Sequence, residues 1–163
     1  LYHGVFLDLQ DGEGTNEICI LAGLKSARHP GRLEYAGQYL FDGAHNIGGA
    51  KALSEFIQEY EERPITLLFG AMNDKNVTEI LAILAPLVAR TIVSEPSNSR
   101  SLSYQELLAQ MPSEMSKERI FATNNVKSAI DIANEVTPDD GIILVTGSLY
   151  LVGEVKSILQ SQI

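Results

Sequence analysis

The stretch Phe41-Asp42-Gly43-Ala44-His45-Asn46 indicates most clearly how this chain folds. It completes the apolar run Tyr39-Leu40-Phe41 and comes directly before a helical pattern, so it marks a point where a strand gives way to a helix. In an open α/β sheet, ligands bind outside the carboxyl ends of the strands. A carboxylate, an imidazole and an asparagine that could cap the helix stand together at this point. The stretch therefore predicts a fold class and the edge of the sheet where a site would lie.

Apolar strands alternate with amphipathic helices from Leu33 onward. The strands are expected at 33–35, 39–41, 65–69, 91–93, 119–122 and 142–145. Helices are expected at 47–62, after Asn76, after a Ser103–Glu106 capping box, from Val126 and after Ser148, the last one carrying Val152. This alternation predicts one α/β domain over 1–163, with a Rossmann-like, mainly parallel (mixed) sheet of about six strands and helices on both faces. A short strand at 5–7 and a helix at 17–25 are expected before it.

Composition excludes several classes of function. The 163 residues carry a formal net charge of -9, which repels a phosphate backbone, so we expect no nucleic-acid partner. Cys19 is the only cysteine, which excludes an internal disulfide and a cysteine zinc site and fits a reducing compartment. The three histidines are too scattered to suggest a metal site. The apolar runs are too short to cross a bilayer, so we expect a cytoplasmic protein without a membrane partner.

Motifs for phosphate or dinucleotide binding are absent from the sequence. No G-x-x-x-x-G-K-[ST] run occurs, and Gly12-Glu13-Gly14 lacks the third glycine of a dinucleotide fingerprint. No Ser-His-Asp set can be assembled, so the sequence assigns no catalytic residue.

Three side chains around the first strand-to-helix point could bind a ligand. Asp42 could accept hydrogen bonds from vicinal hydroxyls such as those of a ribose, although an acid in a local turn is the simpler interpretation. His45 could donate to a substrate carboxylate or stack on a ring, or it could bond only to the backbone. Arg32 follows Pro30-Gly31 and could reach a phosphate or a base, or it could pair with Glu34 at the surface.

A second candidate segment, Thr146-Gly147-Ser148, follows the last apolar strand. The free N–H groups of the next helix could bind an anion there, or Ser148 could simply cap the helix. Arg100 and Lys75 are weaker candidates in loops after two other strands. Because a parallel sheet gathers such loops on one edge, we expect the candidate loops to converge.

Three strings taken in order resemble one family. They are Pro30-Gly31-Arg32-Leu33-Glu34, Asp42-Gly43-Ala44-His45-Asn46 and Thr146-Gly147-Ser148-Leu149-Tyr150. Together they resemble the C-terminal domain of folylpolyglutamate synthase/dihydrofolate synthase, within the Mur ligase superfamily, and the resemblance covers roughly 23–159. Two positions depart from the family pattern. Ile47 stands where proline is frequent, and His29 where tryptophan is common.

The resemblance implies an ATP-dependent ligase that phosphorylates a carboxylate, after which the amine of L-glutamate attacks the acyl phosphate. The substrates would be ATP, L-glutamate and a folate, with magnesium held mainly by an N-terminal ATPase domain in cis that this chain lacks. By the same resemblance, Arg32 and Asp42 would contact ATP, with Asp42 on the ribose, and His45 would lie near the incoming glutamate. The substrate-binding residues would be His45, Asn46, Ser148 and Tyr150.

Two alternatives stay open from the sequence. The chain could be the C-terminal domain of a cell-wall Mur ligase, or a stand-alone α/β binding module without catalysis. Since phosphoryl transfer needs a phosphate cradle and a metal, we expect the isolated domain to have no ligase activity.

Overall fold

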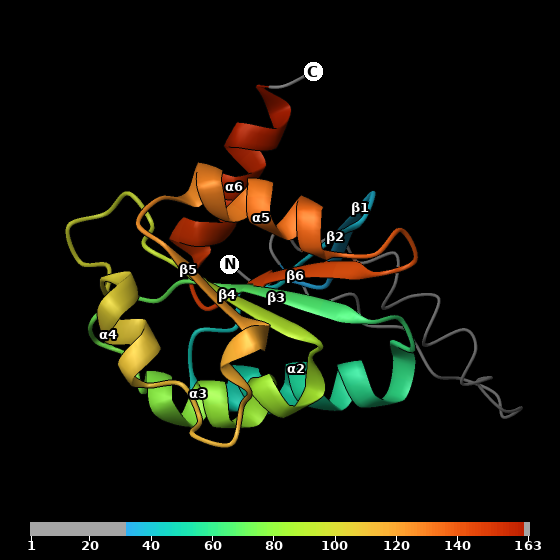
Figure 1. Cartoon of the computed structure of the whole chain (residues 1–163), viewed down its shortest axis with the longest axis horizontal. Helices are drawn as coiled ribbons and strands as arrows, with labels where there is room; N and C mark the ends of the chain where they lie inside the picture. The colour runs from blue at the N-terminus through green and yellow to red at the C-terminus, as the bar shows by residue number, and fades with distance from the viewer. Residues whose placement is uncertain (1–31, 162–163) are drawn as a thin grey trace, which may run out of the picture.

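The structure is a computed structural model that describes residues 32–161, and the strand and helix expected at 5–7 and 17–25 lie outside that range. Within it, six strands form one sheet in the order β1-β2-β6-β3-β4-β5 (Figure 1). The strands are β1 (Glu34–Ala36), β2 (Tyr39–Phe41), β3 (Ile65–Phe69), β4 (Arg90–Ser94), β5 (Ile120–Thr123) and β6 (Ile142–Thr146). Only β1 runs antiparallel to its neighbour in this sheet. The predicted mainly parallel, mixed sheet is confirmed.

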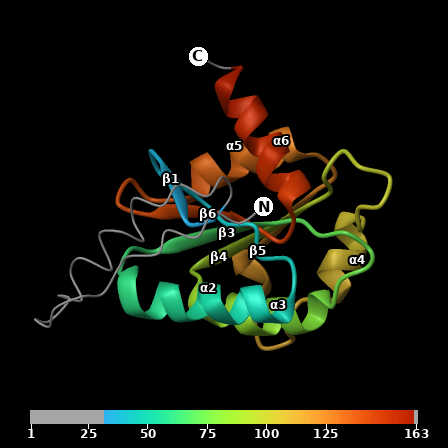
Figure 2. The ribbon, with the colours of Figure 1, turned by 180° about the vertical axis from the view of Figure 1, so that it is seen from behind.

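Helices cover both faces of the sheet, as the sequence predicts (Figures 1 and 2). One layer contains α2 (Ile47–Tyr60), α3 (Val77–Leu84) and α4 (Tyr104–Ala109), and the other contains α5 (Val126–Val136) and α6 (Leu149–Gln160). Two 3₁₀ turns, η1 (Ala85–Leu87) and η2 (Lys117–Arg119), complete the connections. Within residues 32–161, no helix combines the length and the apolar character that a membrane span requires.

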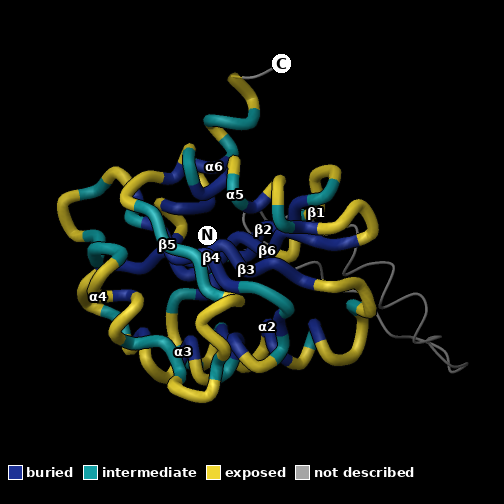
Figure 3. The backbone as a smooth tube through the Cα atoms, in the orientation of Figure 1, coloured by how far each residue is buried: buried dark blue, intermediate teal, exposed yellow. Residues whose placement is uncertain are grey.

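The central strands divide their side chains between two apolar cores. Ile142 and Leu144 of β6 pack with the layer of α2 and α3, whereas Ile143 and Val145 pack under α5 and α6. Every residue of β3 and β6 is buried, which explains why their sequences are apolar except for Thr66 and Thr146 (Figure 3). The sheet is therefore a rigid support for the loops at its ends.

Side-chain caps begin most of the helices. Asn46, Asn76, Asn125 and Ser148 each accept a hydrogen bond from a backbone N–H in the first turn of the next helix. Ser103 and Glu106 form the reciprocal capping box that their spacing predicts. These caps fix the residue at which each connecting loop ends, including the loop that carries Asp42 and His45.

Several predicted element ends are wrong, among them the start of the first strand from Leu33, the end of the helix expected at 47–62, and the strand expected at 119–122, which is Ile120–Thr123. Leu33 was expected in the first strand, but it precedes β1 and has a left-handed backbone, with φ of 46°. The helix expected to reach Glu62 ends at Tyr60, whose side chain is exposed. Glu61 is extended there and its carboxylate binds the Arg63 guanidinium at 2.7 Å, while Pro64 disfavours helix at the preceding residue.

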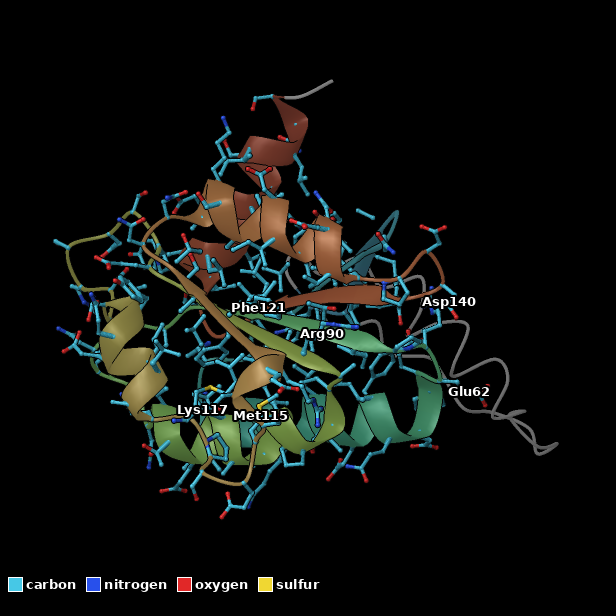
Figure 4. All side chains as sticks on the ribbon, in the orientation of Figure 1. Glu62, Arg90, Met115, Lys117, Phe121 and Asp140 are labelled. Atoms are coloured by element: carbon cyan, nitrogen blue, oxygen red, sulfur yellow. The ribbon has the colours of Figure 1, made fainter. Side chains whose placement is uncertain are left out.

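The predicted site residues lie at one end of the strands only. Figure 4 labels Glu62 and Asp140, which lie near the amino ends of β3 and β6. The loops that contain the predicted site residues follow the carboxyl ends of the parallel strands, at the opposite edge.

Candidate functional site

A cavity of about 360 Å³ lies where β2 ends and α2 begins. Four of the predicted site residues line it, namely Arg32, Asp42, His45 and Asn46. The remaining lining comes from Leu33, from the backbone turn at 43–44 and from one side of α2 at Gly48, Gly49, Ala52 and Leu53. The structure thus brings together residues from two separate sequence strings.

Close packing between α2 and the preceding loop shapes this cavity. A Cβ at Gly49 would lie 3.2 Å from Ala44 Cα, so a larger residue would push the helix away from the loop. Asn46 Oδ1 accepts from Gly49 N–H at 2.8 Å and fixes the first turn of the helix. The glycines of α2 therefore let the loop of Asp42 and the helix approach each other.

The loop after β2 is joined to the loop after β6. Asp42 N–H donates to Val145 O at 3.0 Å, and Gly147 N–H donates to Ala44 O at 3.0 Å. The Thr146 hydroxyl donates to Ala44 O at 3.2 Å. These contacts confirm that the two loops converge on one edge of the sheet, although about a hundred residues separate them in the sequence.

Asp42 is a buried acidic residue. Its Oδ1 accepts from Ala44 N–H at 2.8 Å, and its Oδ2 accepts from Leu33 N–H at 3.1 Å. Burial raises the pKa of this carboxyl above its usual value, and these two donors and the charge of Arg32 oppose the rise. Each carboxylate oxygen has two lone pairs, so both oxygens can accept a further bond from a ligand.

His45 has a defined tautomer and one ring nitrogen left for a ligand. Its Nδ1 lies 2.7 Å from Gly43 O, and because a carbonyl only accepts, Nδ1 carries the proton. In the neutral ring, Nε2 is then an acceptor, and it has no hydrogen-bond partner within residues 32–161. The backbone contact and a ligand role, which the sequence left as alternatives, are therefore compatible.

Arg32 is exposed and lies close enough to Asp42 for its charge to lower the pKa of that carboxyl. The alternative partner expected for Arg32, Glu34, binds Lys156 of α6 at 2.6 Å. The Lys156 ammonium also lies 4.9 Å from the centre of the Phe41 ring, so α6 holds the outer hairpin in place.

Ser148 and Tyr150 do not line the cavity. Ser148 is buried and its hydroxyl accepts from Leu151 N–H at 3.1 Å, which is the capping role given as the alternative. Tyr150 is exposed in the first turn of α6. Their assignment as substrate-binding residues stays a prediction.

The weaker candidates Lys75 and Arg100 lie together in a different set of loops. Both bind the carboxylate of Asp74, at 3.2 Å and 3.0 Å. The backbone of Asn73 bonds to that of Arg100, so the loops after β3 and β4 are joined. Neither cation lines the cavity at Asp42.

No group of three or more His, Cys, Asp or Glu side chains within residues 32–161 is arranged to hold a metal ion.

The sequence did not predict that Leu33 and the small residues on α2 line the cavity. No side-chain feature marks Leu33 as left-handed, because leucine is not a residue type that favours that backbone. The pair Gly48-Gly49 at the start of a helix could have indicated the close approach of the loop to α2, because adjacent glycines weaken a helix unless close packing requires them.

A family model described as "Mur ligase, glutamate ligase domain" matches residues 31–149, which is most of the chain and includes the whole cavity edge from Arg32 to Leu53. The chain belongs to this Mur ligase family. The six-stranded α/β architecture and the convergence of the two loops are thus features of a Mur ligase glutamate ligase domain.

Individual relatives of this Mur ligase domain are named as folylpolyglutamate and dihydrofolate synthases. It is 34% identical over 148 residues to the probable bifunctional folylpolyglutamate synthase/dihydropteroate synthase of Halobacterium salinarum, covering 88% of this chain and 18% of that protein. It is 27% identical over 156 residues to the dihydrofolate synthase/folylpolyglutamate synthase of Mycobacterium tuberculosis, covering 85% of this chain and 32% of that protein.

A solved structure of Mycobacterium tuberculosis folylpolyglutamate synthase complexed with ADP matches this Mur ligase domain with a TM-score of 0.75 and 27% identity. The match covers 88% of this chain and 35% of that one. The chain thus spans between about a fifth and about a third of the length of these relatives.

Proposed function

We propose that this chain is the C-terminal glutamate-ligase domain of a larger ATP-dependent ligase that adds L-glutamate to folates. The parent enzyme would be a folylpolyglutamate synthase, with or without dihydrofolate synthase activity. The observation that carries the proposal is that Asp42 and Arg32 line one cavity at the carboxyl edge of the sheet, in a chain whose relatives include a structure with ADP.

The geometry supports a nucleotide on this domain through its sugar. The Asp42 carboxylate is held by two backbone N–H groups on one side and still has lone pairs for two hydroxyls on the other. A vicinal diol matches a carboxylate because both hydroxyls can donate to it at once. The neighbouring Arg32 guanidinium supplies positive charge for a phosphate or a surface for a base.

We assign the incoming L-glutamate to His45, which lines the same cavity. His45 Nε2 would accept from an ammonium group in the neutral ring, or donate to a carboxylate when the ring is protonated. The ATP γ-phosphate would be transferred to the folate carboxylate, and the amine of glutamate would then displace it. Because no described cluster of this chain fits a metal, we assign magnesium and the phosphate cradle to another domain of the parent enzyme.

The cell-wall branch of the same superfamily is the second candidate, because the family match alone does not choose between the branches. The folate branch is favoured because the relatives quoted above are folate enzymes. A stand-alone binding module is disfavoured by the large share of those relatives that lies outside the match.

The complete gene product tests the proposal. ADP release should require both a folate and L-glutamate, and the product should be a folate one glutamate longer. Release of ADP with UDP-linked peptides, and none with folates, would move the parent enzyme to the cell-wall branch. A complete gene product without any acid-dependent ADP release would favour the binding module.

A further inference from the structure

Leu33 is the only non-glycine residue within residues 32–161 that has a positive φ. Its value of 46° lies in the left-handed region, which an L-residue with a Cβ adopts at an energetic cost. Leu33 is exposed to 40%, so burial of its side chain does not explain why the backbone stays there. A specific contact of the backbone itself must hold the residue in this conformation.

That contact is the hydrogen bond from Leu33 N–H to Asp42 Oδ2, at 3.1 Å. In the hairpin, Glu34 pairs with Phe41, so Leu33 and Asp42 face each other one step beyond the last pair. The main-chain N–H of Asp42 has turned to β6 and donates to Val145 O. Regular antiparallel pairing would leave Leu33 and Asp42 without a backbone hydrogen bond between them, because hydrogen-bonded pairs alternate with non-hydrogen-bonded ones. The Asp42 side chain supplies the acceptor for Leu33 N–H instead.

The same contact decides where the carboxylate points. Leu33 N–H holds Oδ2 and Ala44 N–H holds Oδ1, so both inner positions of the carboxylate are occupied by fixed donors. The remaining lone pairs are directed away from these donors, and the carboxylate lines the cavity. Arg32 is bonded directly to Leu33, so the left-handed turn also sets where its side chain leaves the backbone.

We propose that Leu33 is a positioning residue of the nucleotide site, and that its left-handed backbone, and not its side chain, holds Asp42 and Arg32 in the arrangement that receives a vicinal diol. This inference rests on the proposed function, because it assigns the sugar of ATP to Asp42. Leu33 has an aliphatic side chain, so its residue type alone does not suggest a role in binding a polar ligand.

Three substitutions separate the backbone from the side chain. Leu33→Asn and Leu33→Gly both tolerate the left-handed region, although they remove the aliphatic side chain. Leu33→Val keeps an aliphatic side chain, but its β-branch disfavours that region strongly. In the complete ligase, we expect Leu33→Val to raise the KM for ATP about tenfold, with Asn and Gly staying within about twofold of the unchanged enzyme.

The reverse order would overturn the proposal, because a side-chain role predicts that Val is nearly neutral and that Asn and Gly lose affinity. Circular dichroism identifies a Val variant that does not fold. In that case the Asn and Gly variants decide alone, since a tenfold rise in the KM for ATP in either of them contradicts a backbone role.

A second measurement does not depend on the function of the site. The Leu33 N–H bond lowers the pKa of Asp42, so carbon-13 NMR titration of the Asp42 carboxyl should show a higher pKa in the Val variant and little change in Asn and Gly. Equal Asp42 pKa values in all four proteins would show that the bond does not form as described. The pKa values could follow the predicted order while the KM for ATP is unchanged in every variant. The contact between Leu33 and Asp42 would then exist as described, but it would not position a nucleotide site, and the proposed function of that site would fail.

Discussion

At the scale of single residues, Asp42 is a carboxylate that the fold holds in a buried position. Burial disfavours the charged form of its carboxyl. Within residues 32–161, the charge that opposes this effect is the exposed guanidinium of Arg32. Two backbone N–H groups compensate part of this cost. A residue of lower polarity would be easier to accommodate there, which is consistent with a carboxylate retained for binding.

The pKa of Asp42 predicts a pH dependence of stability. Because this pKa is raised above its usual 3.8, the folded chain binds the proton more tightly than the unfolded chain. The resulting contribution to the free energy of unfolding is fully present below about pH 3.8 and is lost as pH rises through the folded-state pKa. Urea unfolding should therefore show that the free energy of unfolding of the unchanged chain minus that of Asp42→Asn is larger at about pH 3.5 than at about pH 7.

Asp140→Asn is the matched control, since Asp140 is exposed in the turn before β6. Its free-energy difference should vary little over the same range. A difference for Asp42→Asn that grows with pH would mean that the pKa of Asp42 is lowered instead.

His45 predicts a separation between amino-acid and nucleotide use in the complete ligase. His45→Ala should raise the KM for L-glutamate about tenfold and change the KM for ATP by less than about twofold, because one hydrogen bond to a charged group is lost. His45→Asn keeps a side-chain N–H for Gly43 O but lacks Nε2, so it should show the same loss. If His45→Asn kept the original KM for L-glutamate, the free ring nitrogen would not be the group that binds it.

At this scale, the sequence predicts which residues cap the helices but not the backbone conformation of a residue such as Leu33. The caps at Asn46, Asn76 and Ser103 follow from residue type and spacing alone. The backbone of Leu33 does not, because its conformation depends on Asp42, a partner nine residues away that the hairpin brings into contact. Ser148 illustrates the opposite case, where the simple capping interpretation describes what the structure shows.

At the scale of elements, the junction between β6 and α6 depends on one glycine. Gly147 has φ of 105°, and a Cβ there would lie 2.7 Å from Gly70 O and 2.7 Å from the Phe69 ring. Gly147→Ala should therefore lower the free energy of unfolding by about 1–3 kcal/mol. It should also weaken ATP use in the complete ligase, since Gly147 N–H holds Ala44 O beside Asp42.

Gly153→Ala, within α6, is the control. A Cβ at Gly153 meets nothing within 4 Å, so this change should raise the free energy of unfolding by about 0.5–1 kcal/mol. Urea denaturation of both variants measures the contrast. Equal effects of the two alanines would mean that the junction relaxes without cost.

The elements themselves were largely predictable because burial and periodicity are strong in this fold. β3 begins and ends where its apolar run does, since helices cover both of its faces. Ends that depend on side-chain partners were missed, as at α2, where Glu61 leaves the helix and its carboxylate binds both Arg63 and the hydroxyl of Tyr35. Such partners belong to segments that only the folded chain brings together.

At the scale of the whole molecule, we propose that this chain provides one side of a site. The described edge has a carboxylate, a guanidinium and an imidazole, but the sequence has no phosphate-cradling loop, and residues 32–161 have no metal cluster. The purified 163-residue chain should therefore release no ADP from ATP in the presence of a folate and L-glutamate. A coupled ADP assay checks this, and folate- and glutamate-dependent ADP release by the chain alone would contradict it.

The contact between Asp42 and the nucleotide sugar is the central claim, and a cycle of two changes tests it most directly. The complete ligase is assayed with ATP and with 2′,3′-dideoxy-ATP, which lacks both hydroxyls, and each assay is repeated with Asp42→Ala. The account predicts that the unchanged enzyme has a kcat/KM at least about tenfold higher for ATP, and that Asp42→Ala uses the two nucleotides almost equally. An Asp42→Ala enzyme that still preferred ATP by the original factor would contradict it, because the hydroxyls would then be bound elsewhere.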